Sequence, residues 1–443
     1  MTKEELKQKT ISAISLGCDK NRVDLEHMLF GIADFGFKIT PDLEEANIII
    51  VNTCGFLQSA IEEAIQNIEL ALSMKEKGVC EKVIVSGCLP MREKDEITAA
   101  YPEVDAFITL ADNPKIIEII ENLYNVPASK FKFSETGRII THEGGYAYLK
   151  IAEGCSNGCA YCTIPRIRGR FRSVPEKQLL REAENLAKQG YSELILVAQD
   201  TARYGEDLYG APNLVGLLQK LVKIKEIRWI KLQYIYPEWV SVELLEFIQS
   251  HRKMCKYLDM PLQHIDDEIL KKMNRKTSED ETWKLLQLIK TNFPEIILRS
   301  TFIVGFPTEK KKHFKKLCDF IASGMIPYAS FFAYSREPKT PAFYMKGQVR
   351  EFVKKRRLKK ITKIQNVVMN QFLRAQLGKT EEVMVDGYDC KAQMFYGHAK
   401  NSSPEVDLKI TFDFSENPNL AIGDIVPAKF VEINEFGLKG EIV

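Results

Sequence analysis

Short apolar runs alternate with amphipathic stretches along the first third of the chain. Three of the runs are rich in β-branched residues, which is typical of buried parallel strands: ISAISL (11–16), NIIIVN (47–52) and KVIVSG (82–87). Between the second and the third, apolar residues recur at helical spacing on one face: Leu57, Ile61, Ala64, Ile65, Ile68 and Leu72. This strand–helix–strand order predicts a parallel α/β domain over about residues 10–130.

Six further apolar runs follow in the middle of the chain, at residues 146–152, 193–198, 229–235, 256–260, 298–306 and 328–334. Helical patterns separate them, for example over residues 175–189, 242–250 and 279–291. Repeated strand–helix units predict a partial (βα)6 barrel of the TIM type over residues 141–370. A long helix rich in Lys and Arg, at about residues 349–375, is expected to be solvated and to connect two domains.

The last region, residues 373–443, consists of short alternating runs that turn residues interrupt. These runs include EEVMVDG, VDLKITF, DIVPAKFVEI and GLKGEIV. They predict a small antiparallel β-barrel, similar to an OB-fold, at the carboxy terminus. The expected fold class is therefore α/β, with this barrel appended.

The composition agrees with a globular protein of about two to four domains, since 45% of the 443 residues are apolar and 28% are charged. The sequence has no apolar run of about 18 residues, and its start, MTKEELKQKT, lacks the apolar segment of a signal peptide. We therefore expect a cytoplasmic protein without a membrane partner. Ten cysteines in such a chain indicate reduced thiols that serve as buried residues, metal ligands or catalysts.

Three of the cysteines lie close together in the segment GCSNGCAYC (154–162). Their Cys-x3-Cys-x2-Cys spacing can bind three corners of a 4Fe-4S cluster and leave the fourth iron open to a small molecule. A zinc site normally needs four ligands, and no fourth Cys or His is near in sequence. The loop also follows the first predicted barrel strand, at the end where such barrels place their active sites. Cys155, Cys159 and Cys162 are thus predicted cluster ligands, with zinc binding and structural cysteines as the alternatives.

Cys18, Cys54 and Cys88 are far apart in the sequence, but each comes just after a predicted parallel strand. Because the carboxyl ends of parallel strands meet at one edge of a sheet, the three thiols are expected to converge. A glycine adjoins each cysteine, which suits tight turns beside a bulky group. Geometry leaves two interpretations open, a second iron–sulfur cluster or three buried structural cysteines.

Together the two cysteine sets resemble those of the radical S-adenosylmethionine (SAM) methylthiotransferases. The central motif is that of the radical SAM superfamily, and SLGCDKN, NTCGF and SGCL are similar to the three amino-terminal cysteine motifs of this family. The resemblance covers nearly the whole chain. It implies two 4Fe-4S clusters, the second on the amino-terminal cysteines with an open iron that accepts sulfur, and a terminal barrel of the TRAM type. It also implies that SAM is cleaved to methionine and a 5′-deoxyadenosyl radical, with Tyr161 against the adenine.

Two branches of the family differ in substrate: one modifies an adenosine in transfer RNA, the other the β-carbon of an aspartate in small-subunit ribosomal protein twelve. SLGCDKNRVD (15–24), AQDTARYGEDLYG (198–210), YLDMPLQH (257–264) and AYSREPKTPA (333–342) look like the protein-modifying branch. Departures from the family pattern lie in loops near the barrel mouth. They are Thr308 and Lys310 on either side of Glu309 after GFP (305–307), Lys339 before Thr340, and NRKTS after Met273.

Charge gives an independent argument about the substrate. Residues 376–443 contain six Lys, no Arg, five Asp and seven Glu, a net charge of −6. RNA binding relies on Lys and Arg that neutralise phosphates, so an acidic terminal barrel favours a basic ribosomal protein over RNA. The alternative is that this charge only keeps the surface solvated.

Polar residues after other predicted barrel strands are candidates for cofactor binding. Gln199 and Asp200 follow the second strand, and Gln263 and His264 follow the fourth. Gln199 is expected to contact the cofactor. The Gln263–His264 pair can either contact the cofactor or cap the end of the strand.

Arg299 lies in a mostly apolar strand, where a buried arginine needs an anionic partner. That partner is either the carboxylate of SAM or a structural Asp or Glu. Gly305 and Pro307 are candidates to shape the cofactor pocket. The remaining cysteines lack a comparable setting and are predicted core residues, with Cys255 just before a strand: Cys80, Cys255, Cys318 and Cys390.

The sequence therefore predicts a radical SAM methylthiotransferase acting on ribosomal protein twelve. An unactivated C–H bond requires a radical, because no side chain of ordinary pKa removes such a hydrogen as a proton. The reaction also needs a reducing electron donor and a sulfur source, and the sequence assigns no catalytic residue. Two alternatives remain: a transfer RNA adenosine methylthiotransferase, and a noncatalytic iron–sulfur or zinc module that senses redox state.

Overall fold

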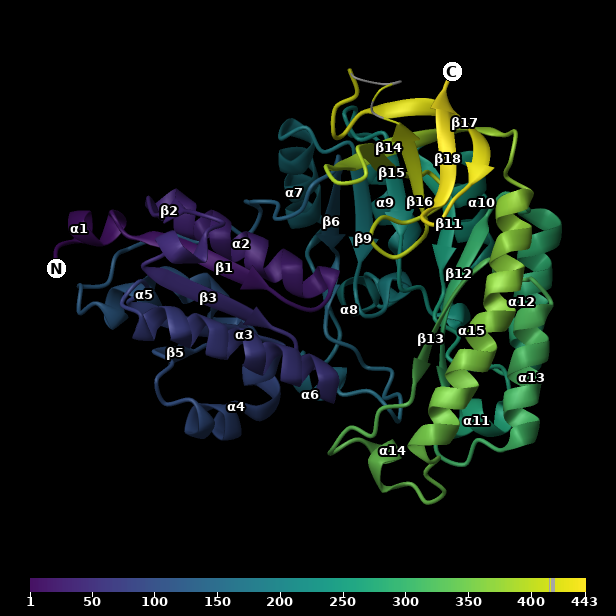
Figure 1. The fold of residues 1–443 in the computed structure, drawn as a ribbon, viewed down its shortest axis with the longest axis horizontal. Coiled ribbons are helices and arrows are strands. Elements are labelled where there is room, and N and C mark those ends of the chain that lie inside the picture. Colours follow the sequence, from purple (N-terminus) through teal and green to yellow (C-terminus); the bar gives the residue numbers. More distant parts are fainter. Residues whose placement is uncertain (414, 416–418) are drawn as a thin grey trace. The chain divides into compact units, whose positions relative to one another are not determined.

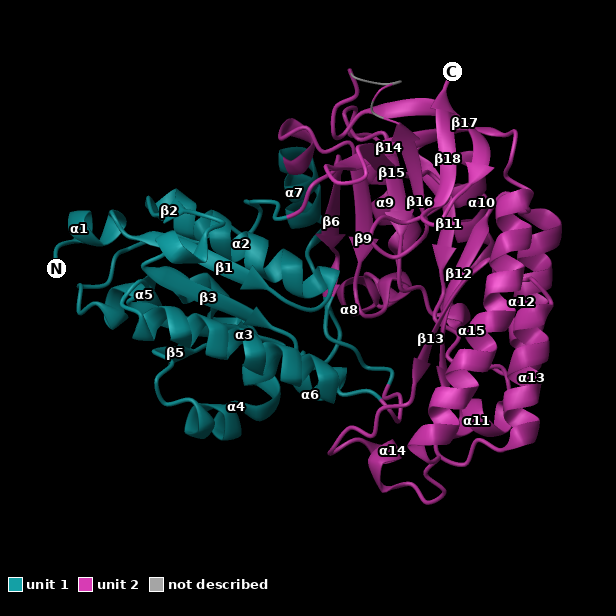
Figure 2. Ribbon diagram, viewed as in Figure 1, with its two compact units in different colours: residues 1–141, 153–157, 162–185 teal, residues 142–152, 158–161, 186–443 magenta. Residues whose placement is uncertain are grey.

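The computed structural model describes residues 1–413, 415 and 419–443. The chain divides into two compact units, which Figure 2 distinguishes by colour. Unit 1 comprises residues 1–141, 153–157 and 162–185, and unit 2 comprises residues 142–152, 158–161 and 186–443. Both units therefore contain part of the segment with the central cysteines. The division into domains at 10–130, 141–370 and 373–443 stays a prediction.

A five-stranded parallel sheet forms the centre of unit 1 (Figure 1). In spatial order the strands are β2 (Lys38–Ile39), β1 (Thr10–Ser15), β3 (Ile48–Thr53), β4 (Lys82–Gly87) and β5 (Ala106–Phe107). β3 is buried along its whole length, as expected for a continuous apolar run in a parallel sheet. β1, β3 and β4 are the three predicted strands, whereas the two-residue strands β2 and β5 are too short to give a sequence pattern.

Helices cover both faces of this sheet. α2 and α5 pack against Ile48 and Ile50 of β3, and α3 and α4 pack against Ile49 and Val51, because successive side chains of a strand point to opposite faces. The helical elements are α1 (Lys3–Lys7), α2 (Asp19–Phe35), η1 (Leu43–Glu45), α3 (Gln58–Glu76), α4 (Cys88–Ala100), η2 (Leu110–Lys115), α5 (Ile116–Leu123) and α6 (Ile164–Ile167). The sheet edge that carries the amino-terminal cysteines is thus built on a packed core.

A six-stranded sheet, parallel throughout, forms the larger part of unit 2 (Figure 1). In spatial order the strands are β13 (Tyr328–Ala333), β12 (Ile297–Val304), β11 (Met254–Asp259), β10 (Trp229–Leu232), β9 (Glu193–Val197) and β6 (Tyr146–Lys150). These are the six strands predicted for the partial barrel. Their spatial order follows the sequence, as repeated strand–helix units require.

Most connections in this region are helical, and side chains define where two of the helices begin. Ser241 Oγ accepts a hydrogen bond from the Leu244 amide at the start of α10, and Ser278 and Glu281 form a capping box at α12. The further elements of unit 2 are η3 (Thr201–Arg203), α8 (Glu206–Tyr209), α9 (Leu214–Leu221), η4 (Pro237–Trp239), α10 (Val242–Ser250), α11 (Asp267–Lys272), α12 (Glu279–Asn292), α13 (Lys311–Ala322), α14 (Pro341–Tyr344) and α15 (Glu351–Arg374). Of the elements between β6 and β9, β8 (Arg172–Ser173) belongs to unit 1, whereas β7 (Ala152–Glu153) and α7 (Glu176–Lys188) are divided between the units. No helix in the described part of the chain is both long and apolar enough to cross a membrane.

Five strands close into a small barrel at the end of unit 2. Around the barrel they are β14 (Thr380–Asp389), β15 (Met394–Ala399), β16 (Lys409–Asp413), β18 (Gly437–Ile442) and β17 (Ile425–Ile433). The predicted terminal barrel is confirmed with one correction. Among the described residues, β16 and β18 pair in parallel, whereas the other neighbours pair antiparallel.

The long basic helix is α15, and two of its cations are buried. Lys354 Nζ donates to the Tyr334 carbonyl (2.8 Å), and Arg357 Nη1 donates to the Glu309 carbonyl (3.0 Å). The expectation of a solvated connecting helix is therefore wrong for this face, which packs on the sheet of unit 2. The other predicted cations are exposed: Lys355, Arg356, Lys359 and Lys360.

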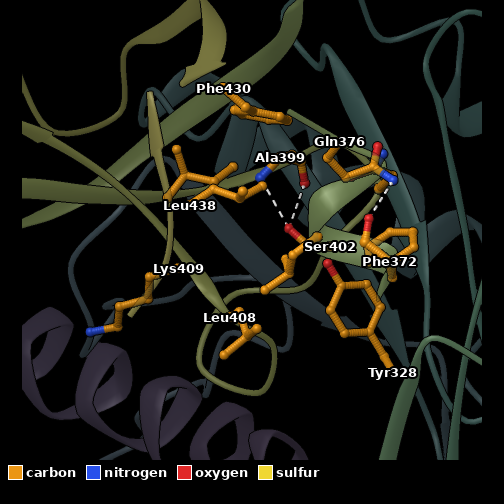
Figure 3. Close-up of a pocket in the computed structure, with 12 residues that line it drawn as sticks. Tyr328, Phe372, Gln376, Ala399, Ser402, Leu408, Lys409, Phe430 and Leu438 are labelled. Carbon is orange, nitrogen blue, oxygen red and sulfur yellow. Dashed lines mark hydrogen bonds between the residues drawn. The ribbon is translucent and has the colours of Figure 1, made fainter. Parts of the chain in front are cut away.

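Figure 3 shows a pocket where the end of α15 meets the terminal barrel. Tyr328, Phe372 and Phe430 give it mainly apolar walls. Within it, Ser402 Oγ accepts a hydrogen bond from the Ala399 amide (3.0 Å) and lies 3.3 Å from the Ala399 carbonyl oxygen. The pocket belongs to the packing between helix and barrel.

Candidate functional site: two sets of three cysteines

Cys18, Cys54 and Cys88 lie at the carboxyl ends of three neighbouring strands of unit 1. Cys18 is the N-cap of α2, Cys54 directly follows β3, and Cys88 is the first residue of α4 after β4. Since β1, β3 and β4 are adjacent in the sheet, the three turns lie side by side at one edge, as the sequence predicts.

Two glycines allow these turns to pack closely. A side chain at Gly17 would place its Cβ 2.9 Å from Cys54 Cβ, and one at Gly55 would place it 2.8 Å from the carbonyl oxygen of Cys88. Gly17 also has a φ of 94°, which residues with a side chain rarely adopt. The three cysteine turns are thus in direct contact.

Polar side chains hold the same turns in place. Asn21 Nδ2 donates to the carbonyls of Leu16 (2.8 Å) and Thr53 (3.2 Å), which joins the first turn to the second. Arg92, on α4 after the third cysteine, donates through Nη1 to the carbonyl of Gly55 (2.8 Å). These bonds satisfy buried carbonyls that the sheet leaves unpaired and fix the geometry of the site.

The three thiols influence one another electrostatically. Burial raises the pKa of the Cys54 thiol, and the neighbouring Cys18 raises it further. Burial raises the pKa of Cys88 to about 12, an effect that the positive charge of Arg168 opposes and that Cys18 and Cys54 increase. Because metals bind thiolates, loading this site releases protons, and a nearby cation favours the binding-competent form.

Arg168 lies directly at this site, although no motif in the sequence points to it. Its Nη2 is 3.4 Å from Cys88 Sγ and 3.2 Å from Asn21 Oδ1, and its Nη1 pairs with Asp24 (2.9 Å) and Glu153 (3.0 Å). The side chain is only 1% exposed. No local motif connects Arg168 with Cys88, 80 positions earlier, so only the folded chain reveals the contact.

The central cysteines lie on the loop after β6. Cys155 and Cys159 are buried, and Cys162 is half-buried. The Cys155 amide donates to the carbonyl of Gly169 (3.1 Å), and the Ile164 amide donates to Cys162 Sγ (3.4 Å). The segment immediately after the loop therefore holds its two ends.

Cys159, which belongs to unit 2, contacts a second arginine that the sequence analysis treats only as part of a departure from the family pattern. Arg275 Nη1 is 3.8 Å from Cys159 Sγ, and its guanidinium lies over the ring of Tyr236 at 4.1 Å from the centroid. The Tyr236 hydroxyl is itself 3.7 Å from Cys159 Sγ. An arginine and a tyrosine thus surround this thiol with hydrogen-bonding groups.

The donor chemistry of both sets fits an iron–sulfur cluster. The predicted ligands of each set are three thiols alone, without an imidazole or a carboxylate. Three thiols suit three corners of a 4Fe-4S cluster with one open iron. Across residues 1–413, 415 and 419–443, no three His, Cys, Asp or Glu side chains already surround one metal position. The assignment of the six cysteines as ligands therefore stays a prediction.

Three of the other candidates lie after strands of the large sheet or on the central loop. Asp200 is fully buried after β9, and Gln199 and Tyr161 are partly exposed. The residue before Tyr161 is fixed by backbone hydrogen bonds, since the Ala160 amide donates to the Met273 carbonyl (2.9 Å). Cofactor contacts by Gln199 and Tyr161 stay predictions.

Gln263 and His264 extend the sheet beyond the end of β11. Gln263 has a φ of 70°. Its backbone amide donates to the Thr301 carbonyl (2.8 Å), and its backbone carbonyl accepts from the Ile303 amide (2.9 Å). His264 is buried, which lowers its pKa to about 3, and its Nδ1 accepts from the Asp266 amide (3.0 Å). His264 is therefore a neutral ring that accepts from the residue before α11, while a cofactor contact by the Gln263–His264 pair stays a prediction.

Arg299 pairs with two carboxylates of unit 2. Its Nη1 is 3.2 Å from Asp259 Oδ1, and its Nε is 3.3 Å from Asp407 Oδ1, before β16 of the terminal barrel. Asp407 also accepts from the Tyr257 hydroxyl (2.7 Å). The structure thus supplies the acidic partners that the sequence left open, near the amino end of β12. Contact between Arg299 and SAM stays a prediction, and Arg299 is already paired with Asp259 and Asp407 without it.

The loop after β12 is pinned by a buried carboxylate. The Glu309 side chain accepts from the amides of Gly305 and Phe306, and its Oε1 is 3.0 Å from Arg357 Nη1. Burial raises the pKa of Glu309 to about 7, while Arg357 opposes this shift. Gly305 has a φ of 77°, and Pro307 is buried. Their role in shaping a cofactor pocket stays a prediction.

Three of the four remaining cysteines are core residues, as predicted. Cys80, Cys255 and Cys318 are buried, although Cys255 lies within β11 rather than before a strand. The prediction is wrong for Cys390, which is exposed just after β14, where the strand pattern gives way to a turn.

Comparisons with known families agree with the arrangement described above. The radical SAM superfamily model matches residues 149–321, the uncharacterised protein family UPF0004 matches residues 10–109, and the TRAM domain matches residues 377–443. Among solved structures, the radical S-adenosylmethionine methyltransferase TsrM from Kitasatospora setae has a TM-score of 0.56 at 12% identity, covering 76% of this chain and 77% of that one. At this identity the likeness supports the fold alone.

Curated relatives match over nearly the whole chain. Ribosomal protein uS12 methylthiotransferase RimO of Trichlorobacter lovleyi is 39% identical over 448 residues, which cover 99% of each chain. The proteins of the same name from Geobacter sulfurreducens and Elusimicrobium minutum are 40% and 41% identical, with 98% of this chain and 98% and 99% of theirs covered. The chain therefore belongs to the family of ribosomal protein uS12 methylthiotransferases, which are radical SAM enzymes.

Proposed function

We propose that this chain replaces one hydrogen on the β-carbon of an aspartate in ribosomal protein uS12 with a methylthio group. The observation that carries the proposal is the presence of two three-cysteine sets in a chain that resembles uS12 methylthiotransferases from end to end. When bound, two 4Fe-4S clusters and SAM supply electron transfer, a carbon-centred radical and a sulfur carrier. The clusters are held by Cys155, Cys159 and Cys162 and by the amino-terminal set.

The chain's own residues bind and orient these groups. Arg275 and the Tyr236 hydroxyl position the Cys159 thiol, and burial of the thiol limits its access to water. Glu309, held by Arg357, fixes the loop at the carboxyl end of β12, where parallel strand–helix barrels place their active sites. Gln199 and Tyr161 contact SAM in this proposal.

The substrate is a basic protein, and the terminal barrel offers it acidic side chains. Some of these carboxylates are already paired within unit 2: Asp386 with His398, Asp407 with Arg299. Other exposed ones carry the attraction to a basic partner: Asp389, Asp424, Glu432, Glu435 and Glu441. A cellular reductant and a sulfur donor complete the reaction, which takes place in the cytoplasm with the ribosomal protein.

The test is mass spectrometry of uS12 from a bacterial strain that lacks its own uS12 methylthiotransferase. Expression of this chain is expected to add the mass of one methylthio group less one hydrogen to the peptide with the target aspartate. A Cys155→Ala variant is the matched control and is expected to add nothing. A methylthio-adenosine in transfer RNA with unmodified uS12 would instead support the RNA branch, and a chain that never cleaves SAM under dithionite would support a noncatalytic redox module.

A further inference from the structure

Arg168 is a buried cation at a site of three thiols. Its Nη2 lies 3.4 Å from Cys88 Sγ, and that sulfur is also 3.9 Å from Asn21 Oδ1, which accepts a hydrogen bond from the same Nη2. Cys88 and Cys18 both help to raise the pKa of Arg168 above its usual value. One half of the guanidinium is therefore directed at the cysteine turns.

Two carboxylates hold the other half. Nη1 lies 2.9 Å from Asp24 Oδ2 and 3.0 Å from both oxygens of Glu153. The planar fork of arginine makes both sets of contacts at once. At the same end of α2, Asp19 and Lys20 pair with each other at 2.8 Å. Arg168 is thus oriented by its anionic partners and left with Nη2 for Cys88.

The segment that carries Arg168 also touches the second cysteine turn. Thr163, the residue after Cys162, donates through Oγ1 to the Phe56 carbonyl (3.1 Å), two residues after Cys54. The Arg168 amide closes α6 by donating to the Ile164 carbonyl (2.8 Å). Residues 163–168 therefore begin directly after Cys162, a predicted ligand of the central cluster, and end at Arg168, which contacts Cys88 of the amino-terminal set.

We infer that Arg168 is a positioning residue of the amino-terminal cluster site, which holds the Cys88 thiolate and sets the reduction potential of the cluster. The inference deepens the proposed function and rests on it, because it takes the amino-terminal cysteines as cluster ligands. A cation in contact with a ligand thiolate stabilises the more negative, reduced state of a cluster, since it offsets the added charge, and Arg168 and Cys88 make this contact where both are buried. Removal of that cation makes one-electron reduction harder.

The experiment isolates the amino-terminal cluster. In a full-length chain in which Cys155, Cys159 and Cys162 are all replaced by Ala, only the amino-terminal set can hold iron, at about four irons per chain. After anaerobic reconstitution, the cluster is titrated with dithionite and redox mediators, which pass one electron to it, and the reduced form is followed by electron paramagnetic resonance. The parent is compared with Arg168→Gln, Arg168→Lys and Arg166→Gln. Arg166 is the matched control, because it is an exposed arginine on the same helix.

Arg168→Gln is expected to lower the equilibrium constant for reduction at least tenfold, a fall of about 59 mV in the midpoint potential of a one-electron couple. Arg168→Lys, which keeps the charge, is expected to remain nearer the parent, and Arg166→Gln to equal it. If Arg168→Gln fails to hold iron, retention of iron by Arg168→Lys supports the inference equally, because the two variants differ by the charge.

Two results would overturn the inference. One is an unchanged potential in Arg168→Gln at full iron content. The other is loss of iron from both Arg168 variants while Arg166→Gln retains it, since that pattern indicates packing rather than charge. Failure of the proposed function looks different: the parent itself binds no iron, or the unmodified chain leaves uS12 unchanged.

Discussion

The two cysteine sets are assembled in different ways. The central thiols come from one loop, and their spacing in the sequence predicts that they converge on one cluster. The amino-terminal thiols come from three turns that meet only because β1, β3 and β4 are neighbours in a parallel sheet. The first set therefore depends on local chain conformation, and the second depends on the fold of unit 1.

The two sets share one feature, an arginine in contact with a single thiol. Arg168 lies 3.4 Å from Cys88 Sγ, and Arg275 lies 3.8 Å from Cys159 Sγ. Arg168 is oriented by carboxylates, whereas Arg275 stacks on Tyr236 and donates to the Pro261 carbonyl. Each set thus has a cation beside one thiol, but carboxylates hold the first cation and an aromatic ring holds the second.

The largest expected effect separates the roles of the two sets. Cys159→Ala is expected to abolish SAM cleavage, with a loss well beyond the roughly 100-fold typical of changes next to metal ligands. Cys88→Ala is expected to keep SAM cleavage and to lose methylthio transfer to the same extent. Both are measured as 5′-deoxyadenosine formed under dithionite and as modified uS12 peptide. Loss of SAM cleavage in Cys88→Ala would show that the sets do not act separately.

Arg275 is expected to support the central site as Arg168 supports the other. Arg275→Gln removes the cation beside Cys159 and is expected to slow SAM cleavage by about 10- to 100-fold. The measurement is the rate of 5′-deoxyadenosine formation at saturating SAM, normalised to iron content. Lys276→Gln, an exposed neighbour, is the control and should have no effect. An equally active Arg275→Gln enzyme would remove the parallel between the two arginines.

Glycine substitutions test how tightly the amino-terminal cysteine turns and the central loop are packed. Gly87 has a φ of 91°, and a Cβ there would lie 2.3 Å from the Thr53 carbonyl oxygen, whereas a Cβ at Gly158, on the central loop, would meet only Asn274 Nδ2 at 3.4 Å. Gly87→Ala is expected to lower the free energy of unfolding by about 3 kcal/mol or more. Gly158→Ala is expected to cost about 1 kcal/mol from its backbone conformation alone. Urea denaturation of the iron-free chains measures both, and equal losses would contradict the contrast.

The smallest expected effect concerns pH, because the two units contain different buried ion networks. In unit 1, Arg138 pairs with Glu26 and Glu182 and stays charged at any ordinary pH. In unit 2, His398 lies between Asp386 (2.8 Å) and Glu193 (2.6 Å). Burial alone lowers the pKa of His398, but these carboxylates hold it above its usual value.

A raised histidine pKa stabilises the fold fully below the unfolded value of 6.5, and this stabilisation is lost as pH rises through the folded pKa. We therefore expect the β9 region of unit 2 to open more readily at about pH 8.5 than at about pH 6, while the β3 region of unit 1, a strand without histidine, changes little. Hydrogen exchange, corrected for intrinsic rates, measures both regions. His398→Gln should remove the pH dependence, and its persistence in that variant would exclude His398 as the cause.

Much of the fold follows from local patterns in the sequence. Buried β-branched runs identify β1, β3 and β4, and a helical pattern identifies α10 at residues 242–250. The cysteines of both sets are found in the same way, from spacing or from their position after strands. β2 and β5 escape this approach because two residues form no pattern, and Lys354 and Arg357 escape it because a basic helix gives no sign that one charged face is buried.

The two arginines could not be predicted for a related reason. Arg168 meets Cys88 because the chain after the central loop returns to unit 1, and Arg275 meets Cys159 because the end of α11 lies against the central loop. Neither contact is indicated by the local pattern of apolar and polar residues. Long-range contacts of single side chains therefore required the structure, whereas the ligands themselves did not.

Iron content tests the central claim, that the chain has two separate three-cysteine cluster sites, most directly. The anaerobically reconstituted chain is expected to bind about eight irons, and Cys18→Ala and Cys155→Ala are each expected to bind about four. Mössbauer spectra of the two variants should each show a single 4Fe-4S cluster. A chain that never binds more than about four irons, or a single substitution that removes all iron, would contradict the account.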